Sequence, residues 1–178
     1  MIDGDVEKRT VWAKVLQSRG EMGYPYIFFT DNANNGAADV YKDKNLPIYA
    51  SNLCTEIMLP SDHNWSFVCV LSSINVLHYD KWKDTDAVET MIYFLDAVIT
   101  EFLEKLEVYK NSDDLDDQQT FLFMERAYNF SKENRALGMG VLGWHSLLQS
   151  KMLPFDSQGA FDLNSEVFKN IKEHSNKA

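Results

Sequence analysis

The sequence predicts an α/β fold in which helix predominates. Residues 86–108 repeat apolar side chains at i, i+3, i+4 and i+7, which is typical of a long amphipathic helix. About three short β-prone runs are separated from one another by helical patterns. The chain has 178 residues, of which 45% are hydrophobic, and this is enough for one packed domain. Three strands are too few for a closed barrel or a doubly wound sheet, so we expect part of a larger sheet or barrel.

The N-terminal third begins with a predicted helix over residues 6–19, which we expect to end at Gly20 and Gly23. Residues 24–30, "YPYIFFT", form a β-prone run between turn residues. Residues 31–49 are rich in Asn, Asp and Gly and predict a long polar loop. The predicted helix carries an apolar stripe formed by Val11, Trp12, Val15 and Leu16.

The middle of the chain contains both cysteines. Cys54 lies in the segment "ASNLCTEIMLP", residues 50–60, and Cys69 lies in "SFVCVLSSI", residues 66–74, which we expect to be a buried strand. The amphipathic helix of residues 86–108 follows. Asp86 with Glu89 three residues later predicts a capped start for that helix.

The C-terminal third alternates helices with one short strand or turn. The acidic linker "NSDDLDDQQ" leads to a predicted helix over residues 120–130. "RALGMGVLGW" then begins a short strand or turn. Two further helices are predicted, over residues 145–152 and 165–174.

Charge and hydropathy exclude several classes of partner. The net charge of −10 argues against nucleic acid as an electrostatic partner, and no Lys/Arg run forms a polybasic membrane patch. The N-terminus has no apolar segment of signal-peptide length. Acidic residues interrupt the apolar helix of residues 86–108, so it cannot span a bilayer. We therefore expect a cytoplasmic protein without membrane contact.

Three other motifs carry less weight. "GMGVLG" fits G-x-G-x-x-G but follows a polar segment, so close backbone packing is favoured over dinucleotide binding. "DNANNGAADVYK" imitates a calcium loop, but Ala33 and Lys42 stand where ligands belong. The four histidines are scattered and neither cysteine belongs to a close Cys/His pair, so no metal site is expected. Packing as small buried residues is the simplest role for the two cysteines.

Asn52, Cys54 and Glu56 place a carboxamide, a thiol and a carboxylate at alternate positions of one segment. In an extended segment such residues point to the same face, so their polar tips are expected to meet. Glu56 is the nearest ionisable neighbour of Cys54 and disfavours a thiolate. A neutral thiol beside a carboxylate suits radical abstraction of hydrogen from a vicinal diol, although a chance loop sequence would contain the same three residues.

Four segments resemble, in the same order, the large (α) catalytic subunit of class I aerobic ribonucleotide reductases. They are "GYPYIFFTDNANN", "SNLCTEI", "FVCVLSSIN" and "NRALGMGVLGWHSLLQ". The resemblance as a whole extends from about Glu7 to about Phe168. The resemblance implies a helix-rich portion of the family's ten-stranded α/β barrel. It also implies that residues 49–60 form the finger loop at the barrel centre, within a single partial domain over 1–178 and with no second domain.

The resemblance assigns a role to each residue of the loop. Cys54 matches the cysteine that becomes a thiyl radical and takes the 3′ hydrogen of the ribose. Glu56 matches the carboxylate that accepts the 3′-hydroxyl proton, and Asn52 matches the amide that hydrogen-bonds the sugar hydroxyls. Cys69 matches one of two redox-active thiols that reduce the 2′ position and end as a disulfide. The implied substrate-binding residues are Ser51, Asn52, Leu53, Cys54, Thr55 and Glu56.

The cysteine count departs from the family pattern. A complete site needs three thiols, and this chain has two, so the redox partner of Cys69 is expected outside it. The expectation is therefore an internal fragment that reduces ribonucleoside diphosphates to deoxyribonucleotides, for DNA precursor synthesis, only with the remaining segments of the large subunit. The resemblance further implies a small (β) subunit with a metal–radical centre, a thioredoxin- or glutaredoxin-type reductant, and ATP/dNTP effector sites outside this chain.

Two other functions fit the same residues. Cys54 could act as the nucleophile of a hydrolase or transferase, with a histidine brought near it by the fold. The chain could also be a non-catalytic remnant that keeps the motif by descent.

Overall fold

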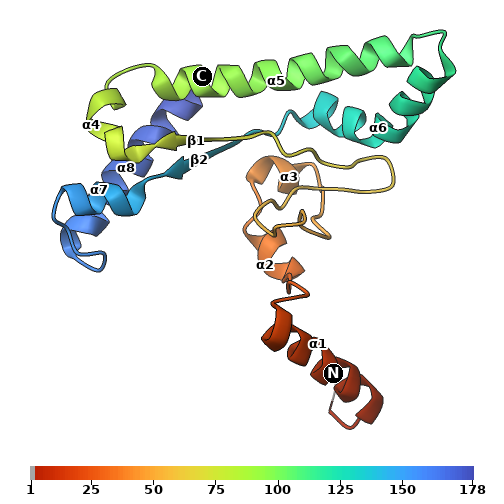
Figure 1. Ribbon diagram of the computed structural model, residues 1–178, viewed down its shortest axis with the longest axis horizontal. Coiled ribbons are helices and arrows are strands. Elements are labelled where there is room, and N and C mark those ends of the chain that lie inside the picture. Colours follow the sequence, from red (N-terminus) through yellow and green to blue (C-terminus); the bar gives the residue numbers. More distant parts are fainter. Residues whose placement is uncertain (1–2) are drawn as a thin grey trace. The chain divides into compact units, whose positions relative to one another are not determined.

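The computed structural model describes residues 3–178, which form two compact units divided between Ser61 and Asp62 (Figure 1). The first unit contains three helices, followed by the loop that bears Cys54; they are α1 (Val6–Met22), α2 (Thr30–Asn35) and α3 (Asp39–Asp43). The second unit contains the remaining elements: β1 (Leu71–Asn75), the 3-10 turn η1 (Val76–His78), α4 (Tyr79–Trp82), α5 (Ala87–Lys110), α6 (Leu115–Asn134), β2 (Gly138–Leu142), α7 (Trp144–Ser150) and α8 (Gln158–Lys177). The predicted single partial domain stays a prediction.

The helix predicted at the N-terminus is confirmed. The Asp5 carboxylate caps α1 by accepting a hydrogen bond from the backbone N of Lys8 (3.0 Å). Gly23 ends the helix with a φ of 77°, and its N–H bonds to the carbonyl of Arg19 (2.9 Å), whereas Gly20 lies inside the helix. No residue of α1 is buried, and Trp12 is 42% exposed. The apolar stripe of this helix therefore covers no core within the first unit.

The β-prone run of residues 24–30 forms no strand, and this prediction is wrong. A strand needs a pairing partner, and the described residues of the first unit form no other strand for it to pair with. The polar segment of residues 31–49 contains two short helices, α2 and α3, rather than one long loop. Asn34 of α2 holds the later part of this segment, because its side chain both donates to the carbonyl of Ile48 and accepts from the N–H of Ile48, each at 2.8 Å.

The second unit is organised around two parallel strands. β1 pairs with β2 from Leu71 opposite Gly138 to Asn75 opposite Leu142. Parallel strands require a crossover connection, and here α4, α5 and α6 provide it. The predicted strand over residues 66–74 is shorter than expected: it begins at Leu71, so Cys69 precedes the strand and is exposed.

The glycines of "GMGVLG" allow this pairing, as the sequence favoured. A Cβ at Gly138 would lie 2.2 Å from Cδ2 of Leu71, and a Cβ at Gly140 would lie 3.0 Å from Oγ of Ser73. Gly143 follows β2 with a φ of 83°, and a Cβ there would lie 2.4 Å from Oδ1 of Asn75. The motif is therefore explained by close contact between β1 and β2.

Helices cover the strands and build the core of the second unit. α5 fulfils the predicted amphipathic pattern, since Val88, Leu95 and Ile99 are each at most 2% exposed. Asp86 stands at its N-cap, where the sequence predicted the start, but its side chain makes no capping hydrogen bond. α6 lies beside α5 and α8 packs against α5 (Figure 1). The buried core residues are Ile74, Val76, Tyr79, Val88, Leu147, Leu148, Ala160, Leu163, Val167 and Ile171.

Candidate functional site

The loop that bears Cys54 is a tight turn built around Asn52. The backbone N of Asn52 donates to the carbonyl of Ile57 (3.2 Å), and its carbonyl accepts from the backbone N of Thr55 (3.2 Å). The side-chain Oδ1 of Asn52 accepts from the backbone N of Glu56 (3.1 Å) and of Ile57 (3.0 Å). Cys54 therefore lies inside a turn that closes on a single asparagine.

This turn corrects the expected geometry of the site. An extended segment, as expected from the sequence, would place alternate side chains on one face. The backbone instead reverses, and Thr55 has a φ of 67°. Cys54 and Glu56 are exposed and Asn52 is half-buried, so the described part of the chain does not provide the expected burial of the thiol. The meeting of the three polar tips stays a prediction.

An aromatic pair lies close to the cysteine within the first unit. The rings of Tyr24 and Tyr26 have centroids 5.3 Å apart. A hydrogen bond with Tyr24, which stabilises the protonated Tyr26 hydroxyl, is the main cause that raises the pKa of Tyr26, and the charge of Cys54 adds a smaller contribution. Tyr26 is therefore within electrostatic reach of Cys54. No role is predicted for Tyr26 from the sequence, although it lies in "GYPYIFFTDNANN", one of the four matched segments.

The predicted redox cysteine lies in the second unit. Cys69 is exposed and precedes β1 by two residues, and it forms no disulfide with Cys54. Cys54 and Cys69 thus belong to different units of the structure. The structure does not test the roles predicted for four residues, which stay predictions; they are Asn52, Cys54, Glu56 and Cys69.

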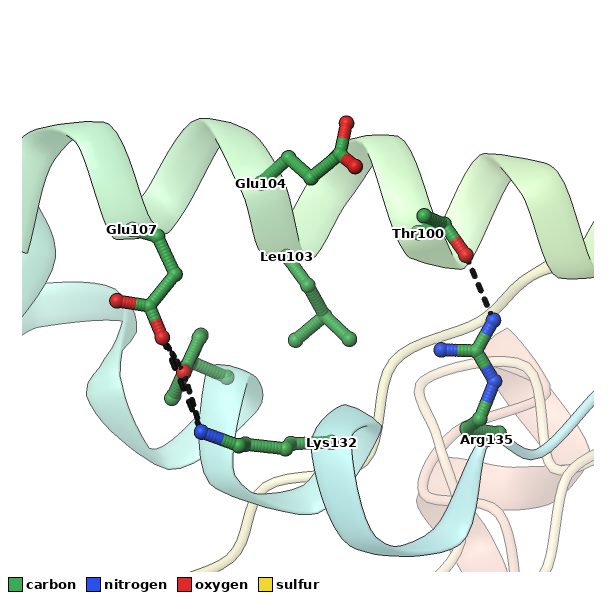
Figure 2. A pocket seen from close by; sticks show the side chains of 7 residues that line it. Thr100, Leu103, Glu104, Glu107, Lys132 and Arg135 are labelled. Carbon is green, nitrogen blue, oxygen red and sulfur yellow. Dashed lines mark hydrogen bonds and ion pairs between the residues drawn. The ribbon is translucent and has the colours of Figure 1, made fainter.

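A separate pocket of about 310 Å³ lies between α5 and α6, and Figure 2 shows its side chains. At one end Arg135 donates to Oδ1 of Asp96 and to Oγ1 of Thr100, both at 2.8 Å. The pocket is lined by Thr100, Leu103, Glu104, Glu107, Tyr128, Lys132 and Arg135.

At the other end of this pocket the Tyr128 hydroxyl donates to Glu107 and accepts from Nζ of Lys132. The hydrogen bond from Tyr128 is also the main cause that lowers the pKa of Glu107. These polar groups hold the two helices together, and none of the predicted site residues lines the pocket.

Other ionisable groups in the structure support the fold. Glu89 is buried at the start of α5 and pairs with His174 Nδ1 (2.9 Å) and Lys177 Nζ (3.1 Å) of α8. Across residues 3–178, no three His, Cys, Asp or Glu side chains gather closely enough to hold a metal ion. Within the same residues, no helix has the length and apolar character needed to cross a membrane.

The described residues define a helix-rich α/β chain with a two-stranded parallel sheet and a cysteine-bearing turn, and the comparisons give the family. A family model described as "Ribonucleotide reductase, barrel domain" matches residues 2–178. A putative ribonucleoside-diphosphate reductase large subunit of Frog virus 3 is 38% identical over 94% of this chain. The large subunit of Invertebrate iridescent virus 3 is 33% identical over 95% of it.

A solved structure gives the same result. The class Id ribonucleotide reductase alpha subunit of Actinobacillus ureae is 52% identical, with a TM-score of 0.79 over 97% of this chain. The chain belongs to the ribonucleotide reductase barrel-domain family, which confirms the predicted resemblance and fold class. It spans 28% and 25% of the two viral relatives and 31% of the bacterial chain.

Proposed function

We propose that this chain supplies the radical-bearing loop of a ribonucleoside-diphosphate reductase large subunit. The observation that carries the proposal is the match of residues 2–178 to the barrel family, with "SNLCTEI" forming one closed turn around the thiol. Cys54 then acts as a hydrogen-atom acceptor rather than as a thiolate nucleophile. Its acidic neighbour Glu56 fits this assignment, because a carboxylate disfavours a thiolate but tolerates a neutral sulfur.

The first half of the proposed reaction uses the turn. The Cys54 sulfur, as a radical, takes the hydrogen atom from C3′ of the ribose, so that an S–H bond forms and the unpaired electron moves to C3′. Glu56 accepts the proton of the 3′ hydroxyl. Asn52 binds the sugar hydroxyls and holds the intermediate in place.

The second half removes the 2′ hydroxyl as water and needs two electrons and two protons. The S–H of Cys54 then returns its hydrogen atom to C3′, which restores the sulfur radical. Cys69 provides one of the two thiols, and a thiol outside this chain provides the other. Their oxidation to a disulfide supplies the two electrons, and a thioredoxin- or glutaredoxin-type dithiol regenerates them. The radical itself comes from a small (β) subunit with a metal–radical centre.

Reconstitution tests the proposal directly. The chain is mixed with the flanking segments of a related large subunit, a small subunit, a dithiol reductant and a ribonucleoside diphosphate, and the deoxyribonucleotide product is measured. We expect product from the complete mixture, no product with Cys54→Ser, and unchanged product with Asn35→Ala, which alters an exposed residue of α2. Equal product from the Cys54→Ser mixture would overturn the proposal.

A further inference from the structure

The segment of residues 62–70 leads into β1 and is itself neither helix nor strand. Backbone hydrogen bonds fix it at two places within the second unit. The carbonyl of Arg126, in α6, accepts from the backbone N of Ser66 (3.1 Å). Further along, the carbonyl of Val70 accepts from the backbone N of Gly138 (2.9 Å), at the start of β2. The segment is therefore a short bridge between α6 and the sheet.

Aromatic packing holds the same segment against α6. The rings of Trp65 and Phe67 each lie edge-to-face with the ring of Phe130, at centroid distances of 6.1 and 6.3 Å. Such contacts between aromatic rings are directional and add to the burial of apolar area. Phe130 is 1% exposed, whereas Cys69, two residues after Phe67, is exposed. One buried ring of α6 thus fixes the stretch of chain that leads to the thiol.

We propose that Phe130 is a positioning residue, which holds Cys69 where the second thiol of the reducing pair can meet it. This inference rests on the proposed function and deepens it, because the role of Cys69 in the reduction is its premise. A disulfide forms only when the two Cβ atoms come to about 3.8 Å from each other. The partner thiol is expected outside this chain, so the second unit itself has to hold Cys69 in place.

Loss of this anchor should slow the reducing step without changing its chemistry. The two thiols still give up two electrons and two protons as the S–S bond forms. Their sulfur atoms, however, spend less time within reach of each other when the segment before Cys69 moves freely. The substrate-binding turn belongs to the first unit, so binding of the ribonucleotide should not depend on this anchor.

Four substitutions test the anchor in the full chain. Phe130→Ala removes both ring contacts, and Phe67→Ala removes one of them from a half-buried position of the segment. If Phe130→Ala does not fold, Phe67→Ala decides alone. Phe67→Tyr keeps an aromatic ring and is the conservative variant. Phe123→Ala is the matched control, because Phe123 is a phenylalanine of the same helix that is 87% exposed.

A nitroxide spin label on Cys69 reports how firmly the thiol position is held. Each variant also carries Cys54→Ser, so that Cys69 is the one cysteine left in the chain. Electron paramagnetic resonance should show restricted motion of the label in the parent, in Phe67→Tyr and in Phe123→Ala. We expect clearly faster motion in Phe67→Ala and in Phe130→Ala.

Amide hydrogen exchange, measured with NMR, gives a second readout at the printed backbone bonds of the segment. Exchange at Ser66 should become about tenfold faster in Phe67→Ala, because the ring contact that supports its bond to α6 is lost. Exchange at Val141, inside the paired strand β2, should stay at the parent rate and shows that the sheet is intact.

Parent-like label motion and parent-like Ser66 exchange in Phe67→Ala would overturn the proposal. So would equal loosening in Phe123→Ala, or loosening in Phe67→Ala that extends to Val141. In the reconstituted reductase with Cys54 present, Phe67→Ala should lower kcat about tenfold and leave KM for the ribonucleoside diphosphate unchanged. A raised KM with unchanged kcat would also overturn it. The label and exchange measurements need no turnover, so absence of product from the complete wild-type mixture would count against the proposed function alone.

Discussion

The two units are held together in different ways. Among residues 3–61, the buried side chains are those of Ile48 and Pro60, and the asparagines Asn34 and Asn52 fix the chain by bonds to the backbone. The second unit instead has a continuous apolar core between its strands and helices. The stabilisation that packing provides increases with the apolar area buried, whereas each side-chain hydrogen bond adds only about 1 kcal/mol to stability. The cysteine-bearing turn thus belongs to the unit with fewer buried side chains.

The largest effect on stability is expected from a substitution in the core of the second unit. Leu147 is 1% exposed and belongs to the cluster with Val76 and Val167. Leu147→Ala should lower the free energy of unfolding by about 2–5 kcal/mol, because it removes buried methyl groups and leaves a cavity. Urea unfolding followed by the fluorescence of Trp82 and Trp144, which pack against this cluster, measures the change.

Leu122→Ala is the matched control, since Leu122 is 65% exposed and should change the unfolding free energy by about 0.5 kcal/mol or less. Amide exchange in α1 sharpens the comparison. If Leu147→Ala released the amides of α1 as strongly as those of α7, the two units would unfold together and the contrast between them would be wrong.

The next effect on stability is expected from alanine substitutions at two glycines, one in each unit. Gly143 has a φ of 83°, and a Cβ there would lie 2.4 Å from Oδ1 of Asn75. Gly143→Ala should therefore destabilise the second unit by about 2–4 kcal/mol. Gly20 lies within α1 and a Cβ there meets nothing within 4 Å, so Gly20→Ala should favour the helix by about 0.5–1 kcal/mol. Circular dichroism during thermal unfolding measures both, and equal signs for the two variants would contradict the comparison.

Substitutions at Arg135 separate the contribution of its side-chain hydrogen bonds to stability from the cost of its backbone conformation. It ends α6 in a left-handed conformation, with a φ of 42°, while its guanidinium bonds to Asp96 and Thr100 of α5. Arg135→Ala loses the bonds and keeps the unfavourable backbone, whereas Arg135→Gly loses the bonds and relieves the backbone. We expect Arg135→Gly to be more stable than Arg135→Ala by about 1 kcal/mol in urea unfolding. The reverse order would show that this backbone conformation costs nothing here.

A further effect appears as the pH is lowered. The pKa of Glu89 is lowered from 4.5 to about 2, first by its own backbone N–H at the start of α5 and then by His174 and Lys177. As the pH falls below 4.5, the unfolded chain binds this proton before the folded chain does, so the stability that Glu89 adds is lost toward pH 2. Wild-type stability should fall more steeply than that of Glu89→Gln between these values, as measured by urea unfolding at each pH. Parallel pH profiles would contradict this assignment.

The sequence predicted regular elements best where one physical signal dominated. The α5 pattern is long and amphipathic, and the end of α1 at Gly23 follows from glycine's tolerance of a positive φ. The close packing predicted for "GMGVLG" follows from its missing side chains. The run at residues 24–30 failed because β propensity acts only when a neighbouring strand is available. The turn at Asn52 was missed because alternation was assumed, although asparagine commonly bonds to nearby backbone amides and such a bond predicts a turn. Burial of the thiol depends on contacts that no local pattern encodes.

The parallel pairing of β1 with β2 also constrains how the protein is made. Leu71 leaves the ribosome long before Gly138, its partner in the register, because α4, α5 and α6 are synthesised between them. During that interval the edge of β1 is uncovered, and pairs so distant along the chain close slowly. Translation speed through the α5–α6 region therefore sets how long the nascent chain exposes a strand that can associate with other chains.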